Sequence, residues 1–411
     1  MNNNKRRGDP PPSSAQAKRF QQQKPPQSVD EYEEMDEDIE ETLLLREEEE
    51  ALIRKDEEER GQVIAARLSK WKRPNLSPAY ISQSKNIIFQ QLEIDYVIGE
   101  RHKELLSSSS GGASAAILRI FGVTREGHSV CCHVHGFEPY FYINCPPGMT
   151  PDVISRFRQA LEARMRETNN KNNNVSKLVL RMEIVQKRSI MYYQQVQSHP
   201  FLKIVLALPT MVAGCRSILE KGIHIDGLGS KNFITYESNV LFALRFMIDC
   251  NIIGGNWIEL PAGKYKKTIR TVSSCQLEID CLYSELISHP PEGEFSKMAP
   301  FRILSFDIEC AGRKGHFPEA IHDPVIQVAN LVTLQGEDQP FVRNIMALKS
   351  CSPIVGVDVM SFETEREVLL AWRRAAALKI TEFPILGRIR NSRTRVKDAT
   401  FSSRSCKGIT S

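Results

Sequence analysis

Residues 301–310 of this sequence read FRILSFDIEC, in which two acids follow a run of mostly apolar residues. Successive side chains of a β-strand point to opposite faces, so Asp307 and Glu309 emerge on the same face. Their like charges repel each other unless a cation lies between them. Mg²⁺ and Mn²⁺ prefer oxygen ligands, and two-metal phosphodiester hydrolysis uses such carboxylates. The pattern indicates either a metal site at the end of a strand or an acidic, exposed strand face.

The residues that follow predict an α/β domain around this strand. Residues 325–334 (VIQVANLVTL) and 341–348 (FVRNIMAL) predict two further strands, with a turn at QGEDQ between them. Residues 361–373 (SFETEREVLLAWR) predict a helix with Ser361 as its N-cap and acids in its first turn. Three strands followed by a helix, with the acids on the first strand, are typical of the sheet of an α/β metal-dependent nuclease.

Residues 71–300 predict a separate mixed α/β domain. Strands are expected at 89–99, 115–123, 130–143 and 203–209, and a helix is expected at 237–249. Another helix is predicted to start at Thr150 and Pro151, because a capping hydroxyl precedes a proline at the first helical position. Its buried face is predicted from an apolar residue at every fourth position: Val153, Phe157, Leu161 and Met165.

The N-terminal region predicts no packed domain. Residues 1–35 are rich in Asn, Gln and Pro, which predicts disorder, and residues 36–70 predict a charged helix, either solvated or bound to a partner. Two basic clusters separated by ten residues resemble a bipartite nuclear import signal: Lys5, Arg6, Arg7, Lys18 and Arg19. The location predicted from them is the nucleus, and a disordered basic tail without a receptor is the alternative.

The charge of the chain is unevenly distributed. Residues 30–60 carry 17 acids and four bases, so a net charge of +4 for the whole chain leaves +17 on the other 380 residues. Such a basic balance favours a polyanionic partner. No apolar run approaches the length of about 18 residues that a membrane span needs. The ten cysteines lack the spacing of paired zinc or disulfide modules, which favours reduced thiols inside the cell.

The stretch CCHVHG invites a zinc assignment, because Cys131, His133 and His135 share one strand face. Three ligands along one strand lie too far apart to close on one ion at metal–ligand distances of about 2.0–2.3 Å. We therefore interpret the three residues as core or half-buried strand residues.

Two further stretches have the composition of nucleic-acid contacts. GFEPYFYI, residues 136–143, predicts either an aromatic surface on which bases stack or a hydrophobic strand bent at Pro139. GKYKKTIR, residues 263–270, predicts either a contact to a phosphate backbone or a solvated hairpin edge. Its basic residues surround Tyr265 and are Lys264, Lys266, Lys267 and Arg270.

Several stretches together closely resemble the delta-type catalytic subunits of the family B DNA polymerases. They are WKRPNLSPAY, FQQLEIDYVIGE, HGFEPYFYI, YESNVLFALRFMIDCNIIGGNW and MAPFRILSFDIECAGRKGHFPEAIHDPVIQVANLV. The resemblance covers residues 71–404 and implies an N-terminal domain at 71–300. It further implies a 3′→5′ proofreading exonuclease domain with a ribonuclease-H-like fold at 301–404. In such domains the D-x-E strand is the first exonuclease motif, which implies that Asp307 and Glu309 bind Mg²⁺ or Mn²⁺, with Asp307 bridging two ions.

The sequence departs from this family after residue 373. The family's second exonuclease motif, N-x-x-x-F-D, is absent, and residues 374–404 resemble what normally lies beyond it. The third motif, Tyr-x-x-x-Asp, is also missing from its expected place. The resemblance further lacks the polymerase domain and the cysteine motifs for zinc and an iron–sulfur cluster, and residues 405–411 form an unrelated tail.

We therefore interpret the chain as a truncated DNA replication enzyme that keeps an N-terminal domain and an incomplete exonuclease domain. Two carboxylates alone should hold Mg²⁺ weakly, so we expect neither DNA synthesis nor proofreading. Binding of single-stranded DNA, or of accessory subunits of replication, is the function that remains. One alternative is a stand-alone Mg²⁺-dependent 3′→5′ exonuclease with replacement ligands among Glu319, His322 and Asp323. Another is a non-productive transcript whose product does not accumulate.

Overall fold

The computed structural model describes residues 72–102, 105, 114–168, 175–190 and 198–377, with single positions between 55 and 66. The predicted import signal, disordered segment and C-terminal tail lie outside these residues, as does most of the predicted charged helix. The chain divides into two compact units, Met1–Arg67 and Leu68–Ser411. The sheets and helices named below belong to the second unit.

A seven-stranded mixed sheet forms first, in the order β11-β12-β3-β2-β1-β10-β13. All neighbours are antiparallel except β12 and β3. Every residue of β3 is buried, and the apolar residues of the sheet build one core with helix α5. The elements are β1 (Ile87–Glu100), β2 (Ser114–Thr124), β3 (Ser129–His135), α5 (Phe242–Asp249), β10 (Trp257–Leu260), β11 (Tyr265–Lys267), β12 (Leu277–Leu282) and β13 (Ile287–His289).

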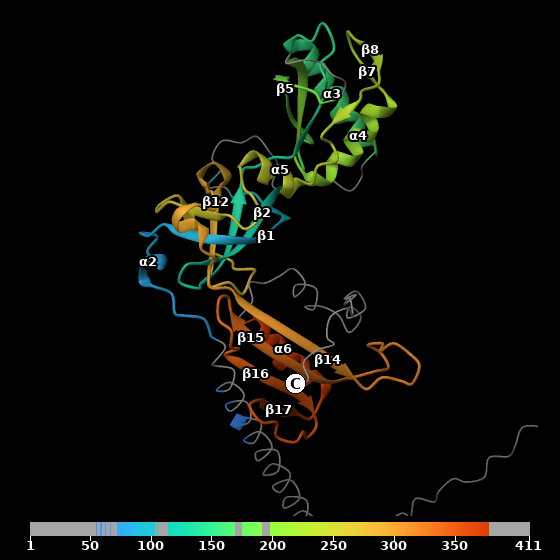
Figure 1. Ribbon diagram of the computed structural model, residues 1–411. Coiled ribbons are helices and arrows are strands. Elements are labelled where there is room, and N and C mark those ends of the chain that lie inside the picture. Colours follow the sequence, from blue (N-terminus) through green and yellow to red (C-terminus); the bar gives the residue numbers. More distant parts are fainter. Residues whose placement is uncertain are drawn as a thin grey trace, which may run out of the picture. The chain divides into compact units, whose positions relative to one another are not determined.

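A second, four-stranded sheet has the order β5-β6-β4-β9 and is covered by helices α3 and α4 (Figure 1). Along the chain the elements run strand, helix, strand, strand, helix, strand: β4 (Tyr140–Asn144), α3 (Pro151–Thr168), β5 (Val179–Lys187), β6 (His199–Leu206), α4 (Val212–Lys221) and β9 (Thr235–Tyr236). A two-stranded sheet, β7 (Ile223–Ile225) with β8 (Gly229–Lys231), adjoins α4 in sequence.

Helix α3 confirms the prediction in both its start and its face. The helix begins at Pro151, and Thr150 Oγ1 accepts a hydrogen bond from the Val153 amide at 3.4 Å. The four residues predicted for the buried face, Val153, Phe157, Leu161 and Met165, are the buried residues of the helix. They pack into the core of the second sheet, which explains the four-residue apolar period.

The strand predicted at 130–143 is wrong, because the chain breaks there into β3 and β4, which belong to different sheets. Gly136 has a φ of 87°, a left-handed conformation that a side chain disfavours. Pro139 follows and has no amide hydrogen to donate to a ladder. The two residues therefore end one strand and redirect the chain into the next sheet.

The third sheet has the order β14-β15-β16-β17, with β16 and β17 parallel and the other pairs antiparallel. Helix α6 contacts β15, β16 and β17 and lies across one face of this sheet (Figure 1). The elements are β14 (Arg302–Cys310), β15 (Val325–Leu334), β16 (Val342–Leu348), β17 (Asp358–Phe362) and α6 (Glu365–Ala377). The three predicted strands and the helix are confirmed.

Ser361, however, is not the N-cap of this helix. It lies in β17, a strand that the sequence analysis missed, and the helix starts four residues later at Glu365. Thr364 Oγ1 instead accepts a hydrogen bond from the Glu367 amide at 3.3 Å. Both residues carry a hydroxyl, and pairing of residues 358–362 with β16 decides which one caps the helix.

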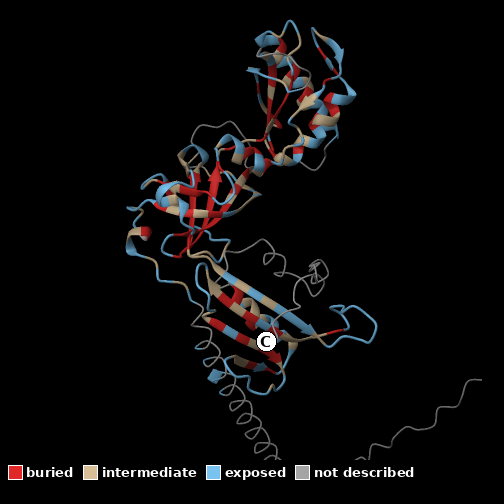
Figure 2. Ribbon diagram, viewed as in Figure 1, coloured by how far each residue is buried: buried red, intermediate tan, exposed pale blue. Residues whose placement is uncertain are grey.

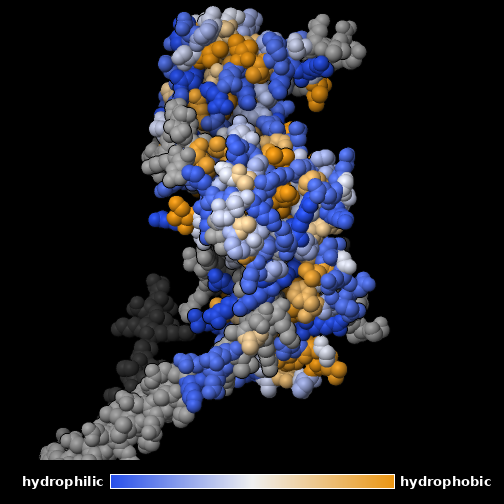
Figure 3. All heavy atoms as spheres, turned by 90° about the vertical axis from the view of Figure 1, so that its left-hand side faces the viewer, coloured by the Kyte–Doolittle hydropathy of each residue, from blue (hydrophilic) through white to orange (hydrophobic). Residues whose placement is uncertain are grey.

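The remaining described elements are short: α2 (Pro78–Ile81) and the 3₁₀ turns Pro209–Met211, Tyr283–Glu285 and Gly293–Ser296. Within the described residues, no helix combines the length and apolarity required to cross a membrane. On the face shown in Figure 3, apolar side chains form separate patches among hydrophilic ones.

Candidate metal and nucleic-acid sites

The predicted metal ligands lie on the exposed face of strand β14. Asp307 and Glu309 are both exposed, and Figure 2 shows that much of the strand is exposed (Figure 2). The Phe306 and Trp372 rings lie 5.0 Å apart, which places Phe306 toward helix α6. Because neighbouring side chains alternate, the two acids point away from that helix. The structure therefore confirms that they share one face.

This arrangement lacks the convergence that a two-metal site needs. The Ile308 amide donates a hydrogen bond to Asp307 Oδ1 at 2.9 Å. Where the structure describes the chain, no third carboxylate, imidazole or thiol closes around Asp307 and Glu309. The donors fit a hard cation such as Mg²⁺ in type, and their number predicts weak binding.

The three candidates for replacement ligands do not supply the missing oxygen atoms. Asp323 is 2% exposed and is engaged elsewhere: Oδ1 accepts from Arg313 N and Nε, both at 3.1 Å, and Oδ2 accepts from Glu319 N at 2.8 Å. Glu319 is exposed and pairs with Arg313 at 3.5 Å, and His322 is exposed. Asp323 thus organises the loop between β14 and β15 rather than facing the two acids as a free ligand.

Hydrogen bonding also changes the acidity of Asp323. The Glu319 amide and then the Arg313 side chain lower the pKa of this carboxyl below its ordinary value. The carboxyl is therefore ionised at neutral pH and holds both ends of residues 313–323. A carboxylate with this role is a structural element of the loop.

The basic stretch at residues 263–270 differs from its predicted pattern. Tyr265 is 2% exposed and donates from its hydroxyl to Lys85 O at 2.8 Å, so its ring belongs to the core of the first sheet. Lys264 pairs with Glu285 at 3.2 Å. The tyrosine therefore offers no ring to a base beside the four cations, and the phosphate contact of Lys264, Lys266, Lys267 and Arg270 stays a prediction.

Aromatic and basic side chains instead meet in a cleft of about 470 Å³ beside strand β4. Its lining includes Tyr140, Tyr142, Arg181, Lys187 and Lys203. Lys203 Nζ lies 3.8 Å from the centroid of the Tyr140 ring, and Lys187 Nζ lies 5.5 Å from that of Tyr142. Alternation along β4 positions both rings on the same face of the second sheet.

The charges in this cleft are partly compensated. Arg181 is paired with Glu138 and Glu183. In the described parts of the chain, neither Lys187 nor Lys203 forms an ion pair, and each has a cation–π contact to a cleft tyrosine. Burial lowers the pKa of Lys203, which indicates that its ammonium group is incompletely hydrated.

Tyr140 is held in place at its polar end. Its hydroxyl donates to Asp249 Oδ2 at 2.5 Å, and burial together with this bond raises the pKa of the phenol. The ring is therefore a neutral, oriented surface next to Lys203 and Arg245, whose charged groups lie 3.8 and 5.1 Å from its centroid. Sequence reasoning named the aromatic run but missed the lysines, because they come from two other strands, β5 and β6, that are distant from the run in sequence. Their meeting depends on the pairing of β4 with β6 and of β6 with β5.

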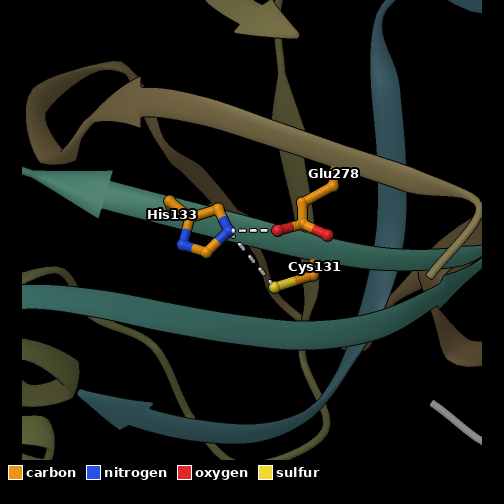
Figure 4. A group of neighbouring side chains, drawn as sticks. All are labelled: Cys131, His133 and Glu278. Atoms are coloured by element: carbon orange, nitrogen blue, oxygen red, sulfur yellow. Dashed lines mark hydrogen bonds and ion pairs between the residues drawn. The ribbon is translucent and has the colours of Figure 1, made fainter. Parts of the chain in front are cut away.

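Two acids of strand β12 contact the stretch that contains Cys131, His133 and His135. His135 Nε2 lies 2.8 Å from Asp280 Oδ1. His133 Nε2 lies 2.9 Å from Glu278 Oε1 and 3.7 Å from Cys131 Sγ, as Figure 4 shows (Figure 4). All of these residues are buried, in agreement with the interpretation as core residues. Cys131, His133 and His135 do not converge on one point, as expected for three residues along a single strand.

Comparison with known proteins matches two stretches of the chain to domains of DNA polymerases. A family model for the exonuclease domain of family B DNA polymerases matches residues 233–374, and one for the N-terminal domain of DNA polymerase delta catalytic subunit-like proteins matches residues 136–213. The DNA polymerase delta catalytic subunit of Glycine max is 72% identical over 369 residues. The chain belongs to the delta-type family B DNA polymerases. Its third sheet, with β14 as the first strand, is consistent with the ribonuclease-H-like fold of that exonuclease domain.

The likeness extends across kingdoms but covers only part of each relative. The Glycine max match spans 84% of this chain and 34% of the relative, and the Bos taurus catalytic subunit is 43% identical over 82% of the chain and 33% of its own length. The chain thus spans about a third of the length of the curated relatives it matches. A solved family B DNA polymerase from Pyrobaculum calidifontis has 21% identity and a TM-score of 0.43, covering 64% of this chain and 27% of its own.

Proposed function

We propose that this chain binds single-stranded nucleic acid through the cleft around Tyr140. The observation that carries the proposal is the position of Lys203, whose ammonium group lies 3.8 Å from the Tyr140 ring centroid. An aromatic surface next to lysines is the combination with which proteins bind single strands without sequence preference. The names of the relatives, all DNA polymerase delta catalytic subunits, support DNA as the nucleic acid.

Tyr140 and the two lysines would have separate roles in this binding, whereas Tyr142 is 6% exposed and its ring is not open to a base. Lys203 has a flexible stem, so a base that stacks on Tyr140 would displace the ammonium group toward an adjacent phosphate. Lys187 lies against Tyr142 and would neutralise a neighbouring phosphate. Binding of this kind weakens as salt is added, because neutralised phosphates release counterions.

We further propose that Asp307 and Glu309 bind Mg²⁺ or Mn²⁺ weakly and that the chain by itself does not hydrolyse DNA. The support is that both acids are exposed on one strand face, while the three nearby alternative ligands are engaged or exposed elsewhere. A bound divalent ion would activate water in an exonuclease site of this kind. Here the two carboxylates would hold such an ion without a third ligand from the described residues. Nuclear location and binding of accessory subunits remain predictions.

The cleft is tested by fluorescence anisotropy of a labelled oligothymidine with wild-type protein and the Tyr140→Ala variant. Loss of one stacked base costs about 1–3 kcal/mol, so we expect the dissociation constant to rise by about 5–150-fold. Tyr96→Ala is the matched control, because Tyr96 is also a strand tyrosine, is 37% exposed and does not line the cleft. Equal affinity of both variants and the wild type would refute binding at this cleft.

A further inference from the structure

We propose that Cys131, His133 and Glu278 form a binding site for one transition-metal ion of the zinc type. Their ligand atoms, Sγ, Nε2 and a carboxylate oxygen, all lie within 4.8 Å of one another. This site uses none of the residues of the Tyr140 cleft or of strand β14, and it does not depend on the function proposed above.

The spacing of the atoms suits a tetrahedral ion. With metal–ligand bonds of about 2.0–2.3 Å, two ligand atoms of a tetrahedral site lie roughly 3.3–3.8 Å apart. Cys131 Sγ lies 3.7 Å from His133 Nε2, which lies 2.9 Å from Glu278 Oε1. Separating the last two atoms by a few tenths of an ångström would make room for the ion.

The strand register explains why these three residues meet. Cys131 and His133 are two residues apart on β3 and therefore share a face. Strand β12 runs parallel beside β3 and places Glu278 opposite Cys131. The third ligand comes from a second strand, and this removes the geometric objection to three ligands along a single strand.

The carboxylate is already oriented by other donors. Glu278 Oε1 accepts from the Val272 amide at 2.8 Å, and Oε2 accepts from the amide of Ser273 at 3.1 Å and its hydroxyl at 2.6 Å. Ligating carboxylates and imidazoles are held in this way by an outer layer of hydrogen bonds. Oε1 keeps its Val272 donor when its contact with His133 is replaced by the metal.

Charge balance also favours a dication here. On binding, the Cys131 thiol would lose its proton to solvent, and the imidazole would carry its single proton on Nδ1 while Nε2 ligates the ion. A thiolate, a carboxylate and a dication together are neutral, which suits a site whose three residues are all buried. Sulfur and imidazole ligands select zinc-type ions over Mg²⁺ or Ca²⁺.

The test uses the full chain, freed of metal with a chelator and titrated with Co²⁺ as a spectroscopic substitute for Zn²⁺. We expect one Co²⁺ per chain, with a sulfur-to-metal charge-transfer band that added Zn²⁺ abolishes. Cys131→Ser should lose that band, and Cys215→Ser should keep it, since Cys215 is an equally buried thiol on helix α4, in the core of the second sheet.

A folded wild-type protein without the band, or a band that persists in Cys131→Ser, would overturn the proposal. Circular dichroism establishes that each variant is folded. If Cys131→Ser does not fold, Glu278→Gln takes its place, because it keeps the size of the side chain and removes the negative charge. For that variant we expect Co²⁺ affinity at least tenfold lower, and unchanged affinity would count equally against the site.

Discussion

At the scale of single residues, Asp323 shows how one carboxylate fixes a loop. Its oxygens accept hydrogen bonds from the Glu319 amide and from the amide and guanidinium of Arg313. Because Asp323 is 2% exposed, removing its carboxylate would leave the Arg313 and Glu319 amides without a hydrogen-bond acceptor at a buried position. The residue that the sequence suggested as a replacement ligand is thus explained by its part in the connection from β14 to β15.

The lowered pKa of Asp323 makes the order of this loop dependent on pH. A carboxyl whose pKa is lower in the folded protein stabilises it above the unfolded value of about 3.9, and this stabilisation is lost as pH falls through the folded value. We expect the Arg313 and Glu319 amides to exchange faster once pH falls below about 4, after correction for intrinsic exchange. Hydrogen exchange followed by mass spectrometry measures this.

Asp323→Asn serves as the control for that experiment. Its amide does not ionise in this range, so we expect fast exchange of the same two amides already at pH 7 and little further change in protection on acidification. Slow exchange of the two amides in this variant at pH 7 would show that the charge of Asp323 does not order the loop.

At the scale of elements, a buried polar network attaches helix α6 to its sheet. Trp372 Nε1 donates to Asn330 Oδ1 at 2.9 Å, and Asn330 Nδ2 donates to Asn344 Oδ1 at 2.9 Å. Asn330 and Asn344 are 2% and 3% exposed and lie opposite each other on β15 and β16. The network therefore joins two strands and the helix that covers them.

Replacing Asn330 by Leu should destabilise this sheet. The change leaves the indole N–H of Trp372 without an acceptor and the side-chain oxygen of Asn344 without a donor, at a cost of about 1–3 kcal/mol each. We expect the urea midpoint of unfolding of the third sheet to fall, monitored by Trp372 fluorescence in a variant without the other two tryptophans. Arg343→Ala is the control, because Arg343 is an exposed neighbour on β16. An unchanged midpoint for Asn330→Leu would show that the network contributes nothing.

The elements also show what local sequence can and cannot specify. Helix α3 was predictable because its cap, its proline and its apolar period lie within one continuous segment. Strand β17 was missed, and Ser361 misassigned, because pairing with β16 decides that region. The division of residues 130–143 had a local signal in Gly136 and Pro139, which a continuous apolar run obscured. Asp307 and Glu309 were placed on one face by alternation alone, whereas Lys203 met Tyr140 only through strand pairing.

At the scale of the whole molecule, the chain combines parts of two regions of a delta-type polymerase and covers about a third of the relatives' length. The described residues offer an aromatic, basic cleft and a pair of exposed carboxylates without a converging third ligand. The cleft supports the proposed binding of single-stranded nucleic acid, and the pair of carboxylates supports the proposed weak binding of a divalent ion.

The most direct test of this account is one incubation of the purified chain with a 5′-labelled single-stranded DNA, first with Mg²⁺ and then with Mn²⁺. The same samples are measured for binding by anisotropy and for shortening of the strand on a gel, beside the Asp307→Ala, Glu309→Ala double variant. We predict binding by both proteins and no metal-dependent shortening that distinguishes them. Shortening by the wild type that disappears in the double variant would contradict the account and establish a stand-alone exonuclease.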